Sequence, residues 1–187
     1  MEFNRLIKKR ASIIRFSSKK PKISQIIEAV DAANLAPSPG NLPILRYTII
    51  ENPDKIFEIA DACQQPFVAE APFLVVVCSV AKNVERAYDK RASRYIKHHV
   101  GAAVENFLLK VTDMGLASCW IGAFADNLVR EIVGVKDDAE VEVILPVGYQ
   151  PSYYKTKQKH KLGAYERIYF ESYGNKHKLP YKKIGGY

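Results

Sequence analysis

Apolar residues recur at spacings of three and four along several stretches of the chain, which is the pattern of helices with one buried face. Residues 3–9 form the first such stretch. A second begins at Ser24, a suitable N-cap residue, and stops at Pro37. A third follows Asn52 and Pro53, which place a capping residue before a proline at the first helical position. Three helices are therefore expected in the first third of the chain.

Two further helices are expected in the second half. One runs from about Tyr95 to Met114, with Gly115 as a C-terminal cap, and carries its apolar face on Val100, Val104, Phe107, Leu108 and Val111. Two alternatives are equally plausible for this apolar face: it packs against the protein's own sheet, or it forms an interface with a second subunit. A shorter helix is expected to be capped by Asp126 and ended by Gly134.

Strand patterns lie between these helices. Residues 46–50 are rich in β-branched and aromatic side chains, and residues 141–149 form a last strand that runs into a Gly-Tyr turn. Residues 73–78 are continuously apolar, which indicates a strand buried on both faces at the centre of the sheet. Residues 117–124 indicate an extended piece with a glycine near its end. Helices alternating with strands predict a sheet covered by helices.

The size and composition are those of a single globular domain. The chain has 187 residues, of which 48% are hydrophobic and 26% charged. The longest apolar run, residues 73–78, is too short to span a bilayer, and residues 1–6 lack the pattern of a signal peptide. We therefore expect a cytoplasmic protein without a membrane partner.

The net charge of +8 raises nucleic acid as a partner, so its position in the chain matters. From Pro151 onward nine Lys and Arg residues stand against two Glu residues, and the first 150 residues are nearly neutral. Within this segment Lys155, Lys157, Lys159 and Lys161 alternate with other residues, as on one face of an extended strand. Such a row binds a phosphate, a polyanion or only water, and a solvated face is the commonest outcome.

Cysteine and histidine patterns give no sign of a metal site or a disulfide framework. Cys63, Cys78 and Cys119 are widely spaced and set among apolar neighbours, so they are expected to be small core residues. His98 and His99 are adjacent, and adjacent helical side chains point about 100° apart. No metal is expected.

The stretch from Leu35 to Leu42 reads Leu-Ala-Pro-Ser-Pro-Gly-Asn-Leu and ends the second helix with two prolines, a glycine and an asparagine. Such a turn exposes backbone N–H groups and small polar side chains that can lie against a flat polar ligand. By local chemistry alone it is more often a plain connection from helix to strand.

No motif for a nucleophile with its base, for a zinc protease or for a phosphate-binding glycine loop occurs. What remains is a set of dispersed segments: residues 10–12, the turn at 37–41, the pair Gln64 and Gln65, residues 121–123, and the lysine row. Together they could offer charge partners, amide hydrogen bonds and close backbone approach to one large, flat, anionic ligand. A cofactor of that kind would carry the reaction itself.

These segments, in this order, resemble the nitroreductase family of FMN-dependent NAD(P)H oxidoreductases. Arg10-Ala11-Ser12-Ile13 is similar to the family's Arg-Arg-Ser-Ile, and residues 36–42 to its Ala-Pro-Ser-Ala-Gly-Asn-Leu. Glu70-Ala71-Pro72 leads into its central strand, residues 115–122 match its Gly-Leu-Gly-Ser-Cys-Trp-Ile-Gly, and residues 146–149 match its Pro-Leu-Gly-Tyr. Each motif is weak alone, but all five occur in register.

The resemblance implies a set of cofactor-binding positions and no catalytic side chain. Arg10 and Ser12 would bind the FMN phosphate and ribityl chain, a glutamine at 64 or 65 the pyrimidine edge of the ring, and the backbone of residues 121–123 would face N5 and O4. The implied cofactor-binding residues are Arg10, Ala11, Ser12, Ile14, Pro37, Ser38, Pro39, Asn41, Gln64, Gln65, Ile121, Gly122, Ala123, Lys157 and Lys159.

Some positions differ from the family's pattern. Ile14 stands where the family usually has a second basic residue, and the adjacent Arg15 is a candidate replacement. Residues 43–45 read Pro-Ile-Leu in place of Gln-Pro-Trp, which removes an amide and an aromatic ring near the flavin. Lys157 and Lys159 replace a Lys-x-Arg pair, so a point charge stands where a bidentate guanidinium is usual.

The implied fold is an α+β, three-layer α/β/α sandwich around a mixed, mostly antiparallel sheet, in an intertwined homodimer where the turn at 37–41 meets the partner subunit's flavin. Residues 1–174 would form the FMN-binding domain and residues 175–187 a basic tail that wraps the partner or stays disordered.

The expected function is transfer of hydride from NADH or NADPH, through flavin N5, to a small oxidised acceptor such as a nitroaromatic or a quinone, by a ping-pong mechanism. Two alternatives stay open: a flavoprotein reduced by a deazaflavin or an iron-sulfur protein, and a non-catalytic basic binding protein on the same fold.

Overall fold

The computed structural model describes residues 1–156 and 163–176. The chain divides into two compact units, Met1–Thr156 and Lys157–Tyr187. The first unit holds the sheet and, among the residues that the structure describes, every helix except α7 (Ala164–Arg167). In the second unit, α7 is followed by a turn in which the backbone N–H of Phe170 donates to the carbonyl of Asn175 over 3.0 Å. The expected boundary between a domain of residues 1–174 and a tail of residues 175–187 stays a prediction.

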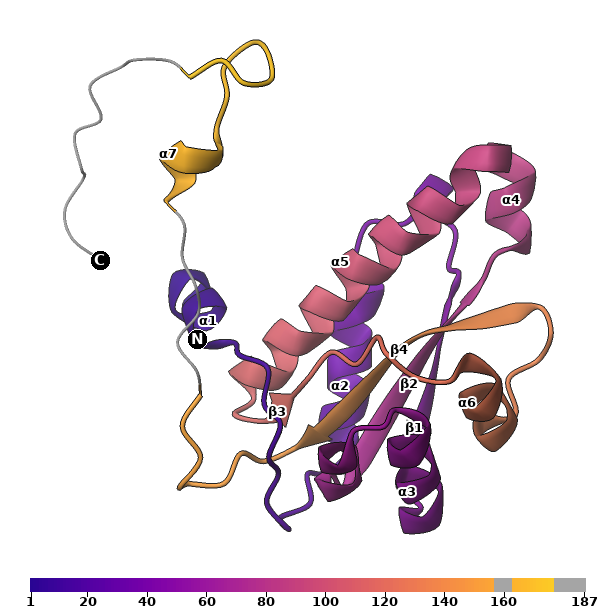
Figure 1. Ribbon diagram of the computed structural model, residues 1–187, viewed down its shortest axis with the longest axis vertical. Coiled ribbons are helices and arrows are strands. Elements are labelled where there is room, and N and C mark those ends of the chain that lie inside the picture. The colour runs from indigo at the N-terminus through magenta and orange to yellow at the C-terminus, as the bar shows by residue number, and fades with distance from the viewer. Residues whose placement is uncertain (157–162, 177–187) are drawn as a thin grey trace. The chain divides into compact units, whose positions relative to one another are not determined.

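A four-stranded sheet forms the centre of the first unit (Figure 1). The strand order is β1 (Leu45–Ile50), β2 (Phe73–Val80), β4 (Ala139–Gly148) and β3 (Ala117–Ser118), and all neighbours are antiparallel. The parallel component is an isolated bridge between Ser12 and Ser118 at the β3 edge. The expected mixed, mostly antiparallel sheet is confirmed.

Strand β2 is the middle of this sheet. It pairs with β1 on one side and β4 on the other, and its residues from Phe73 to Ser79 are all buried. Successive side chains point to opposite faces of a strand, so an unbroken apolar run requires cover on both faces. The expectation of a doubly buried central strand at 73–78 is confirmed, with two further residues at its end.

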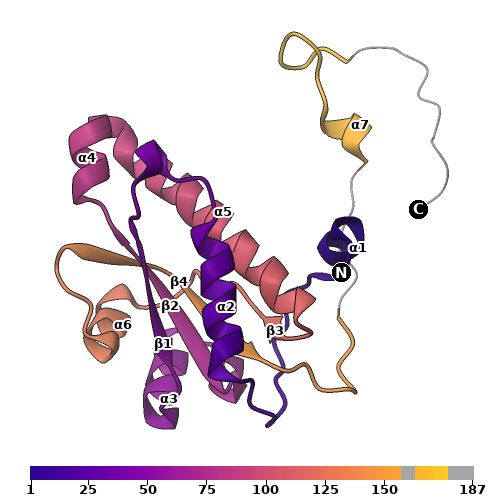
Figure 2. The ribbon, with the colours of Figure 1, turned by 180° about the vertical axis from the view of Figure 1, so that it is seen from behind.

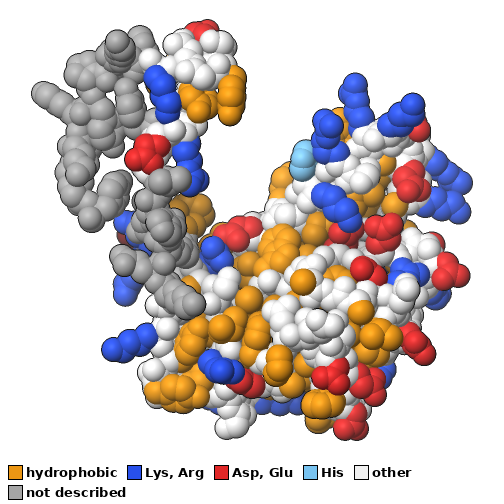
Figure 3. All heavy atoms as spheres, in the orientation of Figure 1, with side chains coloured by type: hydrophobic (Ala, Val, Ile, Leu, Met, Phe, Trp, Pro, Cys, Tyr) orange, Lys and Arg blue, Asp and Glu red, His pale blue; other side chains and the backbone are white. Residues whose placement is uncertain are grey.

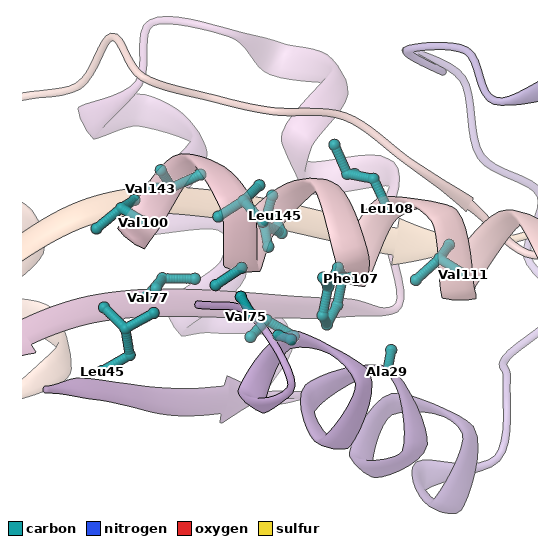
Figure 4. Close-up of a cluster of buried hydrophobic side chains, with 14 of the residues drawn as sticks. Ala29, Leu45, Val75, Val77, Val100, Phe107, Leu108, Val111, Val143 and Leu145 are labelled. Atoms are coloured by element: carbon teal, nitrogen blue, oxygen red, sulfur yellow. The ribbon is translucent and has the colours of Figure 1, made fainter. Parts of the chain in front are cut away.

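Helices α2 (Ile23–Asn34) and α5 (Ala92–Asp113) cover one face of the sheet (Figure 2). The five apolar residues predicted to line the long helix are buried here, together with Val75, Val77, Val143 and Leu145 of the sheet (Figure 4). Asn106 Nδ2 of α5 donates to the carbonyl of Ala32 over 3.3 Å, which joins the two helices. Within one chain, the apolar face of α5 is thus buried against its own sheet.

Helices α3 (Pro53–Ala62) and α6 (Asp126–Val133), with the 3-10 turn Pro66–Glu70, cover the other face. Their core includes Leu74, Val76 and Ile144, the residues that alternate with those of the first face. This arrangement is the three-layer α/β/α sandwich expected from the sequence.

All three cysteines lie in this second core and are free thiols. Burial raises the pKa of Cys63 to about 11 and also raises the pKa values of Cys78 and Cys119. Neutral thiols among apolar neighbours behave as small hydrophobic residues. Their expected role as core residues is confirmed.

Two of the predicted caps are wrong. Helix α2 begins at Ile23, so Ser24 is its second residue, and the backbone N–H of Lys22 donates instead to Gln25 Oε1 over 3.0 Å. Helix α6 has Ala125 as its N-cap, since the carbonyl of Ala125 accepts the first helical hydrogen bond, from the N–H of Val129 over 3.1 Å. Asp126 is therefore the first helical residue and makes no capping bond.

The other helix limits agree with the sequence more closely. Helix α1 spans Phe3–Lys9, and the side chain of Asn52 accepts from the backbone N–H groups of Asp54 and Lys55 at the start of α3. Gly115 and Gly134 have positive φ values of 74° and 73° at helix ends, where glycine avoids the penalty that a Cβ would bring.

Two helices, α4 (Lys82–Tyr88) and the short α7, were not expected from the sequence, and one strand is shorter than expected. Helix α4 buries only Val84, so it leaves no apolar period to recognise. The extended piece at 117–124 pairs regularly only over β3, after which Ile121 makes an isolated bridge to Ile144. In the part of the chain that the structure describes, no helix is both long and apolar enough to cross a membrane.

The difference between the true and the predicted cap gives a stability test. Asn52→Ala should lower the free energy of unfolding by about 1 kcal/mol, because two backbone donors lose their acceptor. Ser24→Ala is the matched control: Ser24 is exposed inside α2, so alanine should be neutral or stabilise by a few tenths of a kcal/mol. Urea denaturation of both variants checks this, and a larger loss for Ser24→Ala would contradict the observed start of α2.

Candidate functional site

The segment after α1 lies along the edge of the sheet. Ser12 bridges Ser118 in parallel, and the backbone N–H of Ile13 donates to the carbonyl of Ser118 over 3.0 Å. The side chain of Ile13 is buried and anchors the segment, while Ser12 stays exposed. The structure thus brings the predicted positions 10–12 beside the predicted segment 115–123.

A buried hydroxyl at this edge lacks a partner. Ser118 is 4% exposed, and its Oγ makes no hydrogen bond to any residue that the structure describes. Beside it, burial raises the pKa of the Cys119 thiol, and a hydrogen bond from Ser12 opposes that shift. Buried polar atoms are rarely left unpaired, because the loss of water without a new partner costs about 1–3 kcal/mol.

The backbone just beyond β3 presents free donors. Ile121 exchanges both of its backbone hydrogen bonds with Ile144, at 3.0 and 3.1 Å, which holds the segment against the sheet. Gly122 and Ala123 are exposed, and their N–H groups donate to no acceptor among the described residues. Two exposed N–H groups on a firmly held segment form a preorganised site for oxygen acceptors of a ligand.

The glutamine pair reaches the same place from the end of α3. Gln65 Nε2 donates to the carbonyl of Ala123 over 3.4 Å, so its side chain lies beside the free donors. Gln64 directly follows the helix and adopts a left-handed conformation, with φ of 52°, that leaves it exposed. The predicted positions 64–65 and 121–123 therefore meet in one chain.

Arg10 ends α1 and is oriented by the long helix. Its Nε lies 3.2 Å from Glu105 Oε1 of α5, and its side chain is half-buried. Ala11 leads from Arg10 to Ser12 and packs against the second core.

Position 14, where the family usually has a second basic residue, carries no charge here. The side chain of Ile14 is 39% exposed, and Arg15 pairs with Glu70 at 2.6 Å between Nη1 and Oε1. Arg15 is thus paired within the chain, and its role as a replacement for a basic residue at position 14 stays a prediction.

The Pro-rich turn lies elsewhere in the chain, at the start of α5. Pro37, Ser38 and Pro39 line a cavity of about 360 Å³ together with Tyr88, Tyr95, His98 and His99. The next two residues, Gly40 and Asn41, both have positive φ, near 60°. A Cβ on Gly40 would come within 2.9 Å of the Tyr88 hydroxyl, so the turn closes directly on this ring.

Aromatic rings dominate this cavity. Tyr88 and Tyr95 meet edge to face, with ring centroids 5.1 Å apart. The ring centroids of Tyr95 and His98 are 6.5 Å apart. His98 is exposed, whereas His99 is 6% exposed and its Nδ1 has no partner among the described residues. Burial lowers the pKa of His99, so its imidazole is neutral at pH 7.

A basic surface surrounds this end of the molecule (Figure 3). It comprises exposed side chains of α4, the following 3-10 turn Asp89–Arg91, and the first turns of α5: Lys82, Arg86, Lys90, Arg91, Arg94 and Lys97. The near neutrality of the first 150 residues hid this local charge from a count along the sequence.

The structure therefore divides the predicted positions into two groups. Residues 10–12 lie along β3, and residues 64–65 meet 121–123 on the segment that follows β3. Pro37, Ser38 and Pro39 line the aromatic cavity instead. Lys157 and Lys159 lie outside the described residues. Sequence reasoning missed Glu105, Tyr88, Tyr95 and His99 as site residues, and only the unusual density of tyrosine and histidine between 88 and 99 could have pointed to the cavity.

Comparison with known proteins gives the family of the chain. The model of the nitroreductase family matches residues 57–149, which include the central strand, α5 and the segment with the free N–H groups. The chain belongs to the nitroreductase family. A protein of Methanocaldococcus jannaschii that is named as a nitroreductase is 34% identical over 87 residues. That match covers 46% of this chain and 43% of the relative, less than half of either.

Two further matches cover more of the chain, one in sequence and one in fold. An iodotyrosine deiodinase of Thermotoga neapolitana is 27% identical over 170 residues, covering 77% of this chain and 86% of that protein. The solved structure of an FMN-dependent nitroreductase from Clostridium difficile superposes with a TM-score of 0.74 at 23% identity, over 90% of this chain and 98% of that one.

The buried histidine predicts a pH-dependent stability. Because the pKa of His99 is lowered in the folded state, the unfolded chain binds the proton more readily, and stability falls as the pH drops below the usual histidine pKa of about 6.5. His99→Gln should flatten this dependence between about pH 7 and the lower folded pKa. His98→Gln, at the exposed neighbour, should keep it. Equal pH profiles of thermal unfolding for both variants would contradict the assignment.

Proposed function

We propose that this protein is an FMN-dependent oxidoreductase that passes hydride from NADH or NADPH to a small oxidised acceptor. One observation carries the proposal: exposed, unpaired N–H groups at Gly122 and Ala123 lie next to Gln65, on an edge that also holds Arg10 and Ser12, in the nitroreductase fold. Among residues 1–156 and 163–176, no nucleophile with its base lies beside them, which fits a site where a cofactor does the chemistry.

The residues at this edge fit FMN in their chemistry. A guanidinium and a hydroxyl suit a phosphate and a polyol chain, and amide groups suit the oxygen-rich edge of a flavin ring. Next to Ser12, the buried Oγ of Ser118 has no hydrogen-bond partner among the described residues. The structural relative from Clostridium difficile is described as FMN-dependent.

Each residue then has a binding or electrostatic role. Arg10 and Ser12 hold the phosphate and ribityl chain, and Gln64 or Gln65 binds the pyrimidine edge. The N–H groups of Gly122 and Ala123 would hydrogen-bond oxygen or nitrogen acceptors of the bound ring, and as fixed dipoles they would need no reorganisation to do so. When bound, FMN supplies the chemistry by accepting a hydride at N5 and delivering it to the acceptor.

The aromatic cavity supports an aromatic acceptor such as a nitroaromatic or a quinone. Its volume is that of a small-ligand pocket, and the tyrosine rings offer stacking surfaces. The turn at 37–41 belongs to this cavity rather than to the β3 edge, so we propose a homodimer in which the turn and the cavity of one subunit face the flavin of the other. A relative named iodotyrosine deiodinase, whose name specifies an aromatic compound, is consistent with this class.

The basic surface on α4 and α5 supports a nicotinamide donor, since its positive side chains attract the phosphates of NADH or NADPH. Lys97 contributes least, because it already pairs with Glu142 at 2.7 Å and with Glu140 at 3.8 Å. Donor and acceptor use the same site in turn, which gives ping-pong kinetics.

A spectrum tests the core of this proposal. The purified protein should bind FMN with micromolar affinity or better, show visible flavin absorbance, and lose it when NADH or NADPH is added without oxygen. Stopped-flow reduction with each nicotinamide identifies the donor. Flavin that binds but is reduced by neither would point to a deazaflavin or iron-sulfur donor, and absence of flavin binding would refute the proposal.

A pair of variants tests the acceptor pocket. Tyr95→Ala should lower kcat/KM for an aromatic quinone by about threefold to tenfold, because it removes a stacking surface worth roughly 0.5–1.5 kcal/mol. Tyr95→Phe keeps the ring and should be close to the parent protein. Steady-state kinetics at saturating donor measure both, and equal effects of the two substitutions would argue against stacking.

A further inference from the structure

Arg10 is held by a carboxylate that its own helix does not supply. Helix α1 has only seven residues and buries none of them, so its packing alone does little to position the arginine at its end. Helix α5, in contrast, has 22 residues and is packed along the sheet. Glu105 of α5 contacts Arg10 Nε at 3.2 Å. This ion pair links the long side chain of Arg10 to the well-packed helix α5.

The contact leaves the useful part of the guanidinium free. Arginine carries five N–H donors in a planar fork, and the ion-pair contact with Glu105 is made at Nε, at 3.2 Å. The two terminal nitrogens of Arg10 make no hydrogen bond or ion pair with any described residue. These four N–H groups are the ones that bind a phosphate in a bidentate manner.

We propose that Glu105 is a positioning residue for the cofactor phosphate: it holds Arg10 by Nε so that the two terminal nitrogens stay turned outward, ready for the anion. This inference rests on the proposed function, since it takes FMN as the ligand. Arginine has many rotamers, and fixing its side chain in advance reduces the entropy that binding must overcome.

A second effect of Glu105 has the opposite sign. Its negative charge repels a phosphate and lowers the net charge of the site, so simple electrostatics predicts tighter binding when the carboxylate is removed. The side chain of Glu105 is 46% exposed, and water and salt screen such a charge. Pre-ordering of Arg10 is therefore expected to outweigh repulsion, and the sign of the measured change decides between the two.

The experiment compares FMN with riboflavin, which has the same ring and ribityl chain but no phosphate. Dissociation constants are measured by quenching of flavin fluorescence. Glu105→Ala should weaken FMN binding by about fivefold to tenfold and leave riboflavin binding unchanged. Glu105→Gln retains an oxygen acceptor for Nε and should restore most of the lost FMN affinity.

Two controls separate positioning from a general disturbance of α5. Glu28→Ala removes the partner of Lys110, another α5 ion pair at 2.6 Å with a carboxylate of similar exposure, and should change neither constant. Arg10→Ala should reduce the preference for FMN over riboflavin, and adding Glu105→Ala to it should have no further effect.

The outcomes are distinct. Unchanged or tighter FMN binding by Glu105→Ala, or an equal loss for riboflavin, overturns the positioning role while leaving the flavin enzyme intact. A parent protein that binds neither flavin overturns the proposed function, and this inference with it.

Discussion

Strand β2 sets the architecture of the molecule. It is hydrogen-bonded on both edges and buried on both faces. Its exclusion from water therefore requires a strand on each edge and a helical layer on each face. Odd-numbered residues such as Val75 face α2 and α5, and even-numbered ones such as Val76 face α3 and α6. One apolar run of the sequence thus requires two helical layers and divides the core in two.

The candidate site follows from this arrangement, because β4 is the neighbour of β2 and carries β3 on its far edge. Residues 10–13 add to that edge through Ser118, and α3 delivers Gln65 to the same place. The groups are far apart in the sequence and approach one another only because each is attached to a different part of one rigid sheet. The donors are backbone N–H groups, which a sequence does not distinguish from any others.

The sequence therefore predicted the fold better than the site. Burial patterns identified the central strand and the helix that covers it, since these depend on many side chains acting together. Single-residue signals were less reliable: Ser24 is chemically suited to cap a helix, but Gln25 captures the N–H of Lys22 and starts the helix earlier. Helix α4 has one buried residue and could not be seen in the pattern.

Site residues were found through resemblance to the nitroreductase family, not through their own chemistry. Arg10 and Gln65 carry no local signal, and their partners Glu105 and Ala123 are distant in the chain. Tyr88 and Gly40 come together only because a left-handed turn closes on the ring. Contacts of this kind depend on the tertiary structure, so residue spacing alone does not predict them.

The reactivity of the three cysteines can report on the opening of one helical layer of the molecule. All of them lie in the core beneath α3 and α6, and their thiols are held neutral and away from solvent. A thiol reagent can react only when that layer opens, since the thiolate is the reactive form. The rate of alkylation of the native protein thus measures opening of one helical layer separately from the layer formed by α2 and α5, which contains no cysteine.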